Sequence, residues 1–169
     1  DILEDSSDAV RDFLNGGAGD DLVVTLSGDN ALSGSDGNDI LCGGLGADNL
    51  QGGAGNDTLV ADLAGLGLGA DDILNGGTGD DLLVGGVGAD RFEFVAGDGN
   101  DTIGDGAADF QSGIDVIALT GMGYADAATA FANVADVNGT AVFSDAQQGL
   151  SITFTDLTTA DLSASDFLV

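Results

Sequence analysis

A nine-residue pattern recurs through the first part of this 169-residue chain. From Gly16 the frames run without a gap to Val60, as GGAGDDLVV, TLSGDNALS, GSDGNDILC, GGLGADNLQ and GGAGNDTLV. Six residues, ADLAGL at 61–66, interrupt the array. The frame resumes over 67–93, and a two-residue slip then leads to AGDGNDTI at 96–103. A fixed period is the signature of a stacked repeat architecture, so this feature constrains the fold more than any other.

Three columns of the frame are nearly constant. Position 4 is glycine except at Ala70, and position 6 is aspartate except at Asn30. The alignment of RDFLN and DIL with later frames places Asp12 and Asp1 at position 6, so we expect the array to begin inside a repeat with further repeats upstream. Position 8 is apolar throughout, as Val23, Leu32, Leu41, Leu50, Leu59, Leu74, Leu83, Phe92 and Ile103.

The frame predicts a parallel β-roll. Side chains alternate along a strand, so only the middle residue of the segment at positions 7–9 points inward, which explains the single apolar column. The glycine-rich hexad supplies a turn with backbone angles that glycine adopts readily. Two frames make one coil, and coils stack as parallel strands about 4.8 Å apart. We therefore expect an all-β chain, with a right-handed β-roll solenoid over 1–103 and a β-rich C-terminal cap over 104–169.

The charge balance is extreme. The chain has 28 Asp, two Glu, two Arg and no Lys or His, for a formal net charge of −28. A chain without a basic face is not expected to bind nucleic acid. No apolar run approaches the ~18 residues that a membrane span requires. An acidic excess also suits a solvated surface or a disordered tail. However, the preference for Asp, the shorter carboxylate that tolerates turns, favours carboxylates held close to the backbone.

Stacked turns bring the position-6 carboxylates together. Like charges ~4–5 Å apart repel by about 1 kcal/mol even in water, and a divalent cation reverses this effect. Calcium binds six to eight oxygen atoms from carboxylates and backbone carbonyls, whereas magnesium retains more water. A chain with no His and one Cys does not suit zinc or copper. We therefore expect several calcium ions. The alternative for any one of these aspartates is a turn residue that binds nothing.

These frames resemble the calcium-binding nonapeptide of the RTX (hemolysin-type) family. The chain is similar to the C-terminal β-roll and secretion domain of type I-secreted bacterial proteins such as the serralysin-type proteases. In that family each calcium lies between two turns on the same edge, one coil apart.

The resemblance implies the following metal ligands. Position-6 carboxylates come from Asp21, Asp39, Asp48, Asp57, Asp72, Asp81, Asp90 and Asp101. Backbone carbonyls come from Gly17, Gly19, Gly37, Gly44, Gly46, Gly53, Gly55, Gly77, Gly79, Gly86 and Gly88. Further candidates are Asp12, Asn30, Asp109 and Asp115.

Two departures from the family pattern affect these sites. The frame at 25–33 has Thr25 and Leu26 in place of glycines and Asn30 in place of aspartate, so we expect its site to be weak or empty. The insertion at 61–66 separates Asp57 from Asp81 and Asp48 from Asp72 in the sequence. We therefore expect it to disturb the sites that these two pairs would form.

The sequence after Ile103 predicts a cap. ADFQSGIDVIALTG resembles the segment that closes RTX rolls, residues 125–135 suit a short helix, and TAVFS with LSITFTDL favours a hairpin. Such a unit would cover the open end of the roll. The core at the junction is expected to include Phe92, Phe94 and Phe110. The terminal DFLV resembles the end of RTX proteases, which implies that type I secretion machinery engages Asp166, Phe167, Leu168 and Val169. The alternative is a docked last strand.

Three functions remain open. The first is a calcium-driven folding module that supports type I secretion of a larger secreted or cell-surface protein. The second is a structural or adhesive calcium module that anchors a surface-layer protein, an adhesin or a polysaccharide-active enzyme. The third, an enzyme, is disfavoured because the chain lacks the His and Lys that most catalytic sites use. Catalytic residues of the parent protein would lie upstream.

Overall fold

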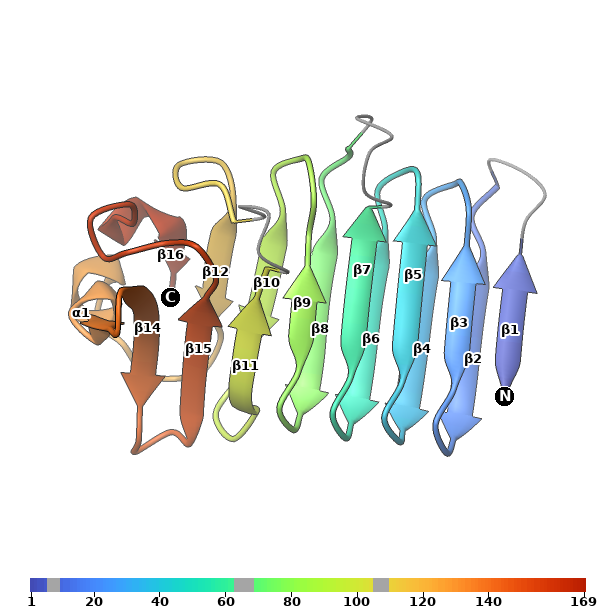
Figure 1. Cartoon of the computed structure of the whole chain (residues 1–169), viewed down its shortest axis with the longest axis horizontal. Helices are drawn as coiled ribbons and strands as arrows, with labels where there is room; N and C mark the ends of the chain where they lie inside the picture. The colour runs from blue at the N-terminus through green and yellow to red at the C-terminus, as the bar shows by residue number, and fades with distance from the viewer. Residues whose placement is uncertain (6–9, 63–68, 105–109) are drawn as a thin grey trace.

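The computed structural model describes residues 1–5, 10–62, 69–104 and 110–169. The chain passes alternately between two facing sheets, and the coils stack along one long axis (Figure 1). One sheet contains β1 (Ile2–Asp5), β3 (Leu22–Thr25), β5 (Ile40–Gly44), β7 (Thr58–Asp62), β9 (Leu82–Val84) and β11 (Gly99–Ile103). The other contains β2 (Phe13–Ala18), β4 (Ala31–Asp36), β6 (Asn49–Ala54), β8 (Ile73–Thr78) and β10 (Arg91–Phe94). Neighbouring strands among these are parallel, which confirms the predicted parallel β-roll.

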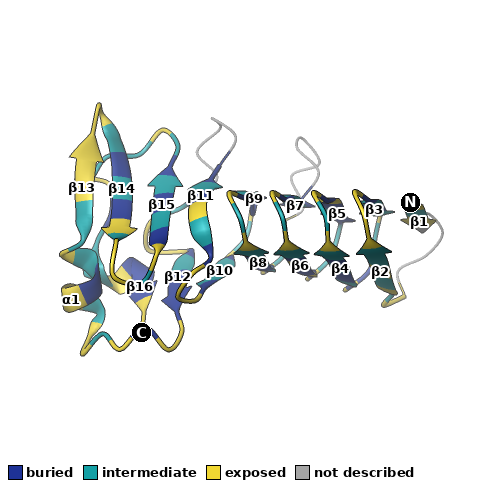
Figure 2. Cartoon of the chain, turned by 90° about the horizontal axis from the view of Figure 1, so that it is seen from below, coloured by how far each residue is buried: buried dark blue, intermediate teal, exposed yellow. Residues whose placement is uncertain are grey.

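The position-8 side chains form the core between the two sheets. Leu41 lies opposite Val23 in one neighbouring strand and opposite Leu59 in the other, so the apolar residues stack in register. All nine predicted core residues are at most 2% exposed. Figure 2 colours the residues by burial: strands of the roll alternate between buried and intermediate positions, and exposed residues occur at the turns. Full burial of each such side chain contributes roughly 1.5–3 kcal/mol, so the column is a major source of stability.

The insertion begins two residues later than the sequence frame predicted. Strand β7 continues through Asp62, which lies opposite Gly44 in β5. The assignment of residues 61–66 as the interruption was therefore wrong at its start, and residues 63–68 lie outside the described part of the chain. The register recovers in the next coil, where Leu59 lies opposite Leu83. A one-residue slip would turn every core side chain to the opposite face, so the recovered register keeps Leu83 in the core.

Both sheets continue past the repeats into residues 110–169, which we call the cap. Strand β12 (Val116–Leu119) is parallel to β10, and β16 (Phe167–Leu168) is parallel to β12. On the other sheet, β15 (Leu150–Phe154) is parallel to β11. The backbone ladder therefore crosses residue 103, and the domain division placed there stays a prediction.

The predicted hairpin of the cap is confirmed. Strand β14 (Thr140–Asp145) pairs antiparallel with β15, and β13 (Val134–Val137) pairs antiparallel with β14. Helix α1 (Ala127–Phe131) is shorter than the expected helix over 125–135, because β13 begins within that range. A single 3₁₀ turn, η1 (Ala164–Asp166), precedes β16.

Aromatic side chains join the roll to the cap. The ring of Phe110 lies 5.9 Å from that of Phe92 and 5.3 Å from that of Phe154, measured between centroids. Phe94 is also buried. The predicted core at the junction is therefore confirmed. Among the described residues, no helix has the length and apolar character needed to cross a membrane.

Candidate metal centre

The position-6 side chains stack along two edges of the roll. We call the edge whose turns lead into the odd-numbered strands the odd edge; it carries Asp1, Asp21, Asp39, Asp57, Asp81 and Asp101. The even edge leads into the even-numbered strands and carries Asp12, Asn30, Asp48, Asp72, Asp90 and Asp115. Both edges arise because every coil consists of two frames, each with one aspartate or asparagine before its apolar strand.

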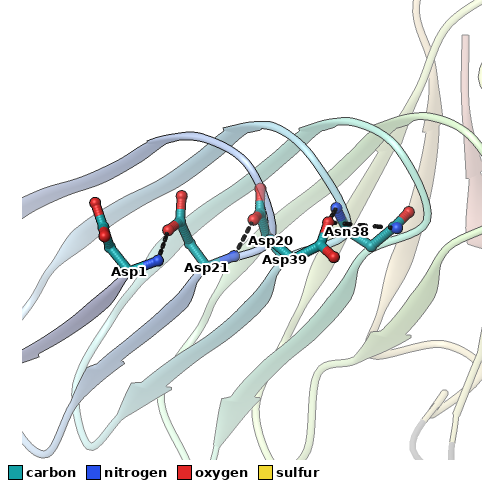
Figure 3. Close-up of polar contacts among 5 residues, drawn as sticks. All are labelled: Asp1, Asp20, Asp21, Asn38 and Asp39. Carbon is teal, nitrogen blue, oxygen red and sulfur yellow. Dashed lines mark hydrogen bonds and ion pairs between the residues drawn. The ribbon is translucent and has the colours of Figure 1, made fainter.

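A ladder of hydrogen bonds connects the side chains along each edge. On the odd edge the backbone N–H of Asp21 donates to Oδ1 of Asp39 (2.7 Å), and that of Asp39 donates to Oδ1 of Asp57 (2.8 Å). Figure 3 shows the start of this ladder, where the terminal amino group of Asp1 donates to Asp21. On the even edge the N–H of Asp72 donates to Oδ1 of Asp90 at 3.0 Å.

The ladders are intact across the insertion. The N–H of Asp57 donates to Oδ1 of Asp81 at 2.7 Å, and the N–H of Asp48 donates to Oδ1 of Asp72 at 2.7 Å. The insertion therefore leaves both of these neighbouring pairs in place. On the odd edge the ladder continues from Asp81 to Asp101 at 3.1 Å.

The second oxygen of each carboxylate is in a different situation. Each of eight buried Oδ2 atoms lacks a hydrogen-bond partner among the described residues: those of Asp21, Asp39, Asp48, Asp57, Asp72, Asp81, Asp90 and Asp101. These are the same eight aspartates that the sequence predicts as ligands. A buried polar atom without a partner costs about 1–3 kcal/mol, and more if charged. A positively charged partner would fit this set of oxygens, and the role of the eight aspartates as ligands stays a prediction.

Glycine at position 1 makes room for these oxygens. A Cβ on Gly52 would overlap Oδ2 of Asp57 and also the carbonyl oxygen of Gly76 in the next coil. Two oxygen atoms thus converge beside one glycine, which is an arrangement that a cation can bridge. The sequence analysis missed position 1, although its signal was visible as the first glycine of each intact frame. The position-1 glycines in contact with Oδ2 are Gly16, Gly34, Gly43, Gly52, Gly76 and Gly85.

The predicted carbonyl-bearing glycines lie at positions 2 and 4 of the turns. A Cβ on Gly53 or Gly55 would overlap the carbonyl oxygen of Ser35 or Gly37, respectively, in the preceding coil. Carbonyl oxygens are therefore stacked between successive turns. All the predicted glycines have φ between 93° and 157°: Gly17, Gly19, Gly37, Gly44, Gly46, Gly53, Gly55, Gly77, Gly79, Gly86 and Gly88. Residues with a side chain rarely adopt these angles.

The electrostatics of the ladders oppose ionisation. The pKa of Asp72 is raised to about 8, mainly by burial and also by the neighbouring carboxylates of Asp90, Asp62 and Asp48, whereas a hydrogen bond from the Asp48 backbone lowers it. Burial likewise raises the pKa of Asp90 and of Asp101 to about 7. A cation next to a carboxylate has the opposite effect on its pKa.

In the frame at 25–33, side chains of the turn itself form hydrogen bonds with its oxygen atoms. The side-chain amide of Asn30 donates from Nδ2 to Oγ1 of Thr25 (3.1 Å) and to the carbonyl oxygen of Gly28 (3.0 Å). The hydroxyl of Thr25 donates in turn to the carbonyl oxygen of Gly43 in the next coil. An amide nitrogen thus lies against oxygens of this turn, and the expectation of a weak or empty site stays a prediction.

The remaining candidates lie at or beyond the ends of the ladders. The backbone N–H of Asp12 donates to Oδ1 of Asn30 at 3.0 Å, so Asp12 belongs to the even edge. Asp115 ends that edge, since its Oδ1 accepts from the N–H of Asp90 (2.9 Å) and its Oδ2 accepts from the N–H of Gln111 (2.6 Å). Asp109 lies outside the described residues.

A second, outer ladder was missed by the sequence analysis. Position 5 is often Asp or Asn, and its side chain accepts a backbone N–H from the next coil. For example, Oδ1 of Asp20 accepts from the N–H of Asn38 at 2.8 Å (Figure 3), and Oδ1 of Asn38 accepts from the N–H of Asn56 at 2.8 Å. These side chains are exposed, so they align the turns but do not share the environment of the buried oxygens.

The donor set fits a hard cation. Carboxylate and carbonyl oxygens are the ligands that calcium prefers. Within the described ranges, no three His, Cys, Asp or Glu side chains form a cluster that could hold a metal ion. A site here would therefore combine two carboxylates with backbone carbonyls. The buried Oδ2 atoms and the stacked carbonyls supply both kinds of ligand.

A parallel β-roll with buried carboxylates and glycine carbonyls along its edges defines a cation-binding repeat module. Residues 9–41, 33–63 and 66–103 match the profile of the RTX calcium-binding nonapeptide repeat. These matches cover more than half of the chain, which therefore belongs to this family and is a calcium-binding repeat module. No curated protein sequence matches the chain.

Two solved structures are similar to this chain. The crystal structure of the extracellular lipase LipA from Serratia marcescens is 17% identical, with a TM-score of 0.51. The match covers 94% of this chain but only 38% of the lipase chain, and it supports the shared fold alone. The solution structure of the AlgE6R3 subunit from the Azotobacter vinelandii mannuronan C5-epimerase is 22% identical, covering 96% of this chain and 80% of that one. Its TM-score of 0.31 is too low to support an argument.

Proposed function

We propose that this chain is a calcium-driven folding module that supports the type I secretion and the stability of a larger secreted protein. The observation that carries the proposal is the stack of eight buried Oδ2 atoms without a donor. Calcium supplies the positive charge that these oxygens lack. The proposal includes several ions per chain and an extracellular or cell-surface location.

The proposed ligands lie between successive turns of one edge. Each ion would contact two position-6 carboxylates one coil apart and carbonyl oxygens of the glycine-rich turns. On the odd edge the pairs are Asp21–Asp39, Asp39–Asp57, Asp57–Asp81 and Asp81–Asp101. On the even edge they are Asp48–Asp72 and Asp72–Asp90.

The same ladders explain why folding would wait for calcium. Without a cation, folding must bury ionised carboxylates next to one another, which opposes the burial of the leucine core. Extracellular calcium modules bind with Kd values of about 10⁻⁴–10⁻³ M. A ligand that binds only the folded chain adds its binding free energy to folding, so the module would remain open at low calcium and close outside the cell.

The C-terminal end fits a role in export before folding. Asp166 and Phe167 are buried in the folded chain, whereas Leu168 and Val169 are exposed. In our proposal the secretion machinery therefore recognises DFLV in the unfolded chain. Replacement of Asp166 and Phe167 by alanine should reduce export of the parent protein from a type I-secreting bacterium. Full export of this variant would contradict the role of the terminal residues.

The direct test of the module is its folding with and without calcium. The far-UV circular dichroism of the chain should show β structure in millimolar calcium and lose most of it in EDTA. Restoration by calcium but not by magnesium would support the proposal, because the sites need more oxygen ligands than magnesium accepts. A chain that is equally folded and equally heat-stable in EDTA would contradict it.

A structural or adhesive role is the second candidate, and one observation favours it. The outer face of β2, β4 and β6 carries a groove of ≈ 330 Å³ whose lining is half apolar and half polar, and whose Phe13 is 75% exposed. The polar lining includes Asn15, Ser33, Asn49 and Gln51. An aromatic ring beside amides suits a neutral sugar. Binding of the calcium-loaded chain to a neutral polysaccharide, lost in Phe13→Ala, would favour this candidate.

The repeat solenoid fits a non-catalytic structural domain. A catalytic activity of the parent protein would then depend on residues outside this chain, and the module would contribute stability and export.

A further inference from the structure

Residues 110–115 form the turn that ends the even edge. Strand β12 follows this turn and lies beside β10 (Figure 1), where the backbone N–H of Val116 donates to the carbonyl oxygen of Asp90 at 2.9 Å. With Asp115 at position 6, Gly113 falls at position 4 and has a positive φ of 80°. The turn is therefore the equivalent of the glycine-rich turns that precede it on this edge.

Positions 1 and 2 of this turn are Phe110 and Gln111 instead of glycine. In the intact frames a Cβ at position 1 would overlap Oδ2 of the aspartate in the same turn, as it would for Gly52 with Asp57. Phe110 has a Cβ, is 4% exposed and belongs to the aromatic core at the junction. Asp115 therefore cannot place its Oδ2 where the intact turns place theirs.

Gln111 donates to two oxygens of the kinds that calcium binds. Its backbone N–H donates to Oδ2 of Asp115 at 2.6 Å, whereas the eight buried Oδ2 atoms of the roll lack a donor among the described residues. Its side-chain Nε2 donates to the carbonyl oxygen of Gly86, the position-2 glycine of the preceding coil, at 3.0 Å. One residue thus supplies donors to a position-6 carboxylate and to a turn carbonyl.

The carbonyl oxygen of Gln111 is also occupied. It accepts from the backbone N–H groups of Ile114 and Asp115, both at 2.9 Å. A cation beside Asp115 would have to displace these hydrogen bonds to reach a carboxylate and carbonyl oxygens, which are the ligands that calcium prefers. The oxygens of this turn therefore do not fit calcium in the way that those of the intact turns do.

We propose that Gln111 takes the place of a calcium ion at the end of the even edge, so that the turn of Asp115 closes without metal. The inference rests on the proposed calcium function and departs from the expectation that Asp115 is a ligand. Asp90 keeps an unpartnered Oδ2 and belongs to the ion that it shares with Asp72. The even edge should therefore hold no ion beyond Asp90.

The first test counts the ions by isothermal calorimetry of the whole chain. Asp115→Asn should bind the same number of calcium ions as the unchanged protein, because the proposal gives Asp115 no ion. The matched control is Asp90→Asn, at the same position of the preceding coil, which should bind at least one ion fewer. Circular dichroism in saturating calcium checks that each variant is folded.

The second test concerns the side chain of Gln111. Gln111→Met has a similar length but no donor. Hydrogen exchange of the β12 amides should become about fivefold faster, because one hydrogen bond is lost. Gln111→Glu has nearly the same size and replaces the donor by an oxygen, so its turn should need a cation. Calcium in excess of the amount that saturates the unchanged protein should slow exchange of β12 in Gln111→Glu but not in Gln111→Met.

The outcomes separate this inference from the proposed function. Loss of an ion in Asp115→Asn would overturn the inference, because Asp115 would then be a ligand. Equal responses of Gln111→Glu and Gln111→Met to excess calcium would also overturn it, since the side chain would then have only a packing role. An unchanged protein that takes up no calcium, with no difference in Asp90→Asn, would instead overturn the proposed function.

Discussion

Asp57 in the roll and Asp166 in the cap are both buried, but their carboxylates have different partners. Oδ2 of Asp57 has no donor among the described residues. Oδ2 of Asp166 accepts from the backbone N–H of Ser163 (2.7 Å) and from Oγ of Ser112 (2.8 Å), and its Oδ1 accepts from the N–H of Gly113 (2.7 Å). The cap therefore neutralises its buried carboxylate with protein donors, whereas the roll leaves that role to an external cation.

The difference shows which part of the fold depends on metal. The cap has aromatic contacts, such as Phe143 with Phe167 at 5.9 Å between centroids, that need no ion. The roll has a continuous apolar column, but its coils also bury eight carboxylates that have an oxygen without a donor among the described residues. We therefore expect the stability of the roll to depend on calcium and the stability of the cap to be largely independent of it.

Removal of calcium should have the largest effect. In EDTA, backbone amides of the β3 to β9 coils should exchange with solvent within seconds, because those coils lose their cations. Amides of β14 and β15 should exchange at least a hundredfold more slowly than those of the roll. Hydrogen exchange measured by mass spectrometry checks this expectation. Equal loss of protection in both regions would show that the cap also depends on the metal.

A matched pair of substitutions should show opposite responses to calcium. Asp57→Asn keeps an oxygen for the N–H of Asp39 but removes a ligand, so it should destabilise the calcium-loaded chain by about 2–4 kcal/mol. In EDTA it should be neutral or stabilising, because it removes a buried charge. Asp166→Asn places an amide against two donors and should cost about 2 kcal/mol in either condition.

Urea unfolding of both variants, with and without calcium, provides the measurement. If calcium changed the effect of Asp166→Asn on the free energy of unfolding as much as that of Asp57→Asn, the roll and the cap would not differ in their dependence on metal. If only the effect of Asp57→Asn changed sign, the difference between roll and cap would be supported.

The pH dependence should also separate the metal-free roll from the calcium-loaded one. Folding raises the pKa of Asp72 to about 8 and those of Asp90 and Asp101 to about 7, mainly through burial. The folded chain therefore binds more protons than the unfolded chain, whose Asp pKa is about 3.9. Stability is then highest below the unfolded pKa and is lost as pH rises through the folded values.

In EDTA we expect the roll to retain β structure at pH 5, where the ladder carboxylates are protonated, and to lose it as the pH rises to 8. In saturating calcium the trend should reverse, because calcium competes with protons for the carboxylates. Thermal scans at both pH values check the sign. A metal-free chain that becomes more stable with rising pH would contradict the burial of ionisable ladder carboxylates.

The sequence predicted the repeating parts of this structure well. The column from Val23 to Ile103 predicted the core, since a period of nine leaves one inward position per strand. The eight position-6 aspartates are the residues whose Oδ2 atoms lack donors. The core is confirmed, whereas the role of the eight aspartates as ligands stays a prediction. Both patterns follow from the repeat, which gives the intact frames similar environments.

The irregular parts could not be predicted in the same way. The frame alone did not show that β7 continues through Asp62, because strand pairing with Gly44 rather than residue type decides where an insertion starts. The first glycine of each intact frame is visible in the sequence, but its contact partner is not, since the approach of Gly52 to Asp57 depends on the closure of the turn. The hydrogen bonds that satisfy Asn30 likewise depend on the three-dimensional position of Thr25.

The smallest expected effect concerns the turn at 25–33, which can be compared directly with the turns of the intact frames. Its Asn30 amide donates to Thr25 and to the Gly28 carbonyl, whereas the equivalent aspartates leave an oxygen without a donor. The double substitution Thr25→Gly with Asn30→Asp gives positions 1 and 6 the residues of the intact frames, and Leu26 stays at position 2. We expect it to add one calcium ion per chain and to lower stability in EDTA by about 1–2 kcal/mol, since a buried hydrogen-bonded amide becomes an unpartnered carboxylate.

Calorimetric stoichiometry and urea unfolding in EDTA measure these two changes. Thr25→Gly alone is the control, because it opens space at position 1 without adding a charge. An unchanged number of ions in the double variant would mean that a position-6 carboxylate and a position-1 glycine are not sufficient for a site. A gain of one ion together with the loss of metal-free stability would show that a single turn can exchange an internal amide donor for a cation, which is the same difference that separates the cap from the roll.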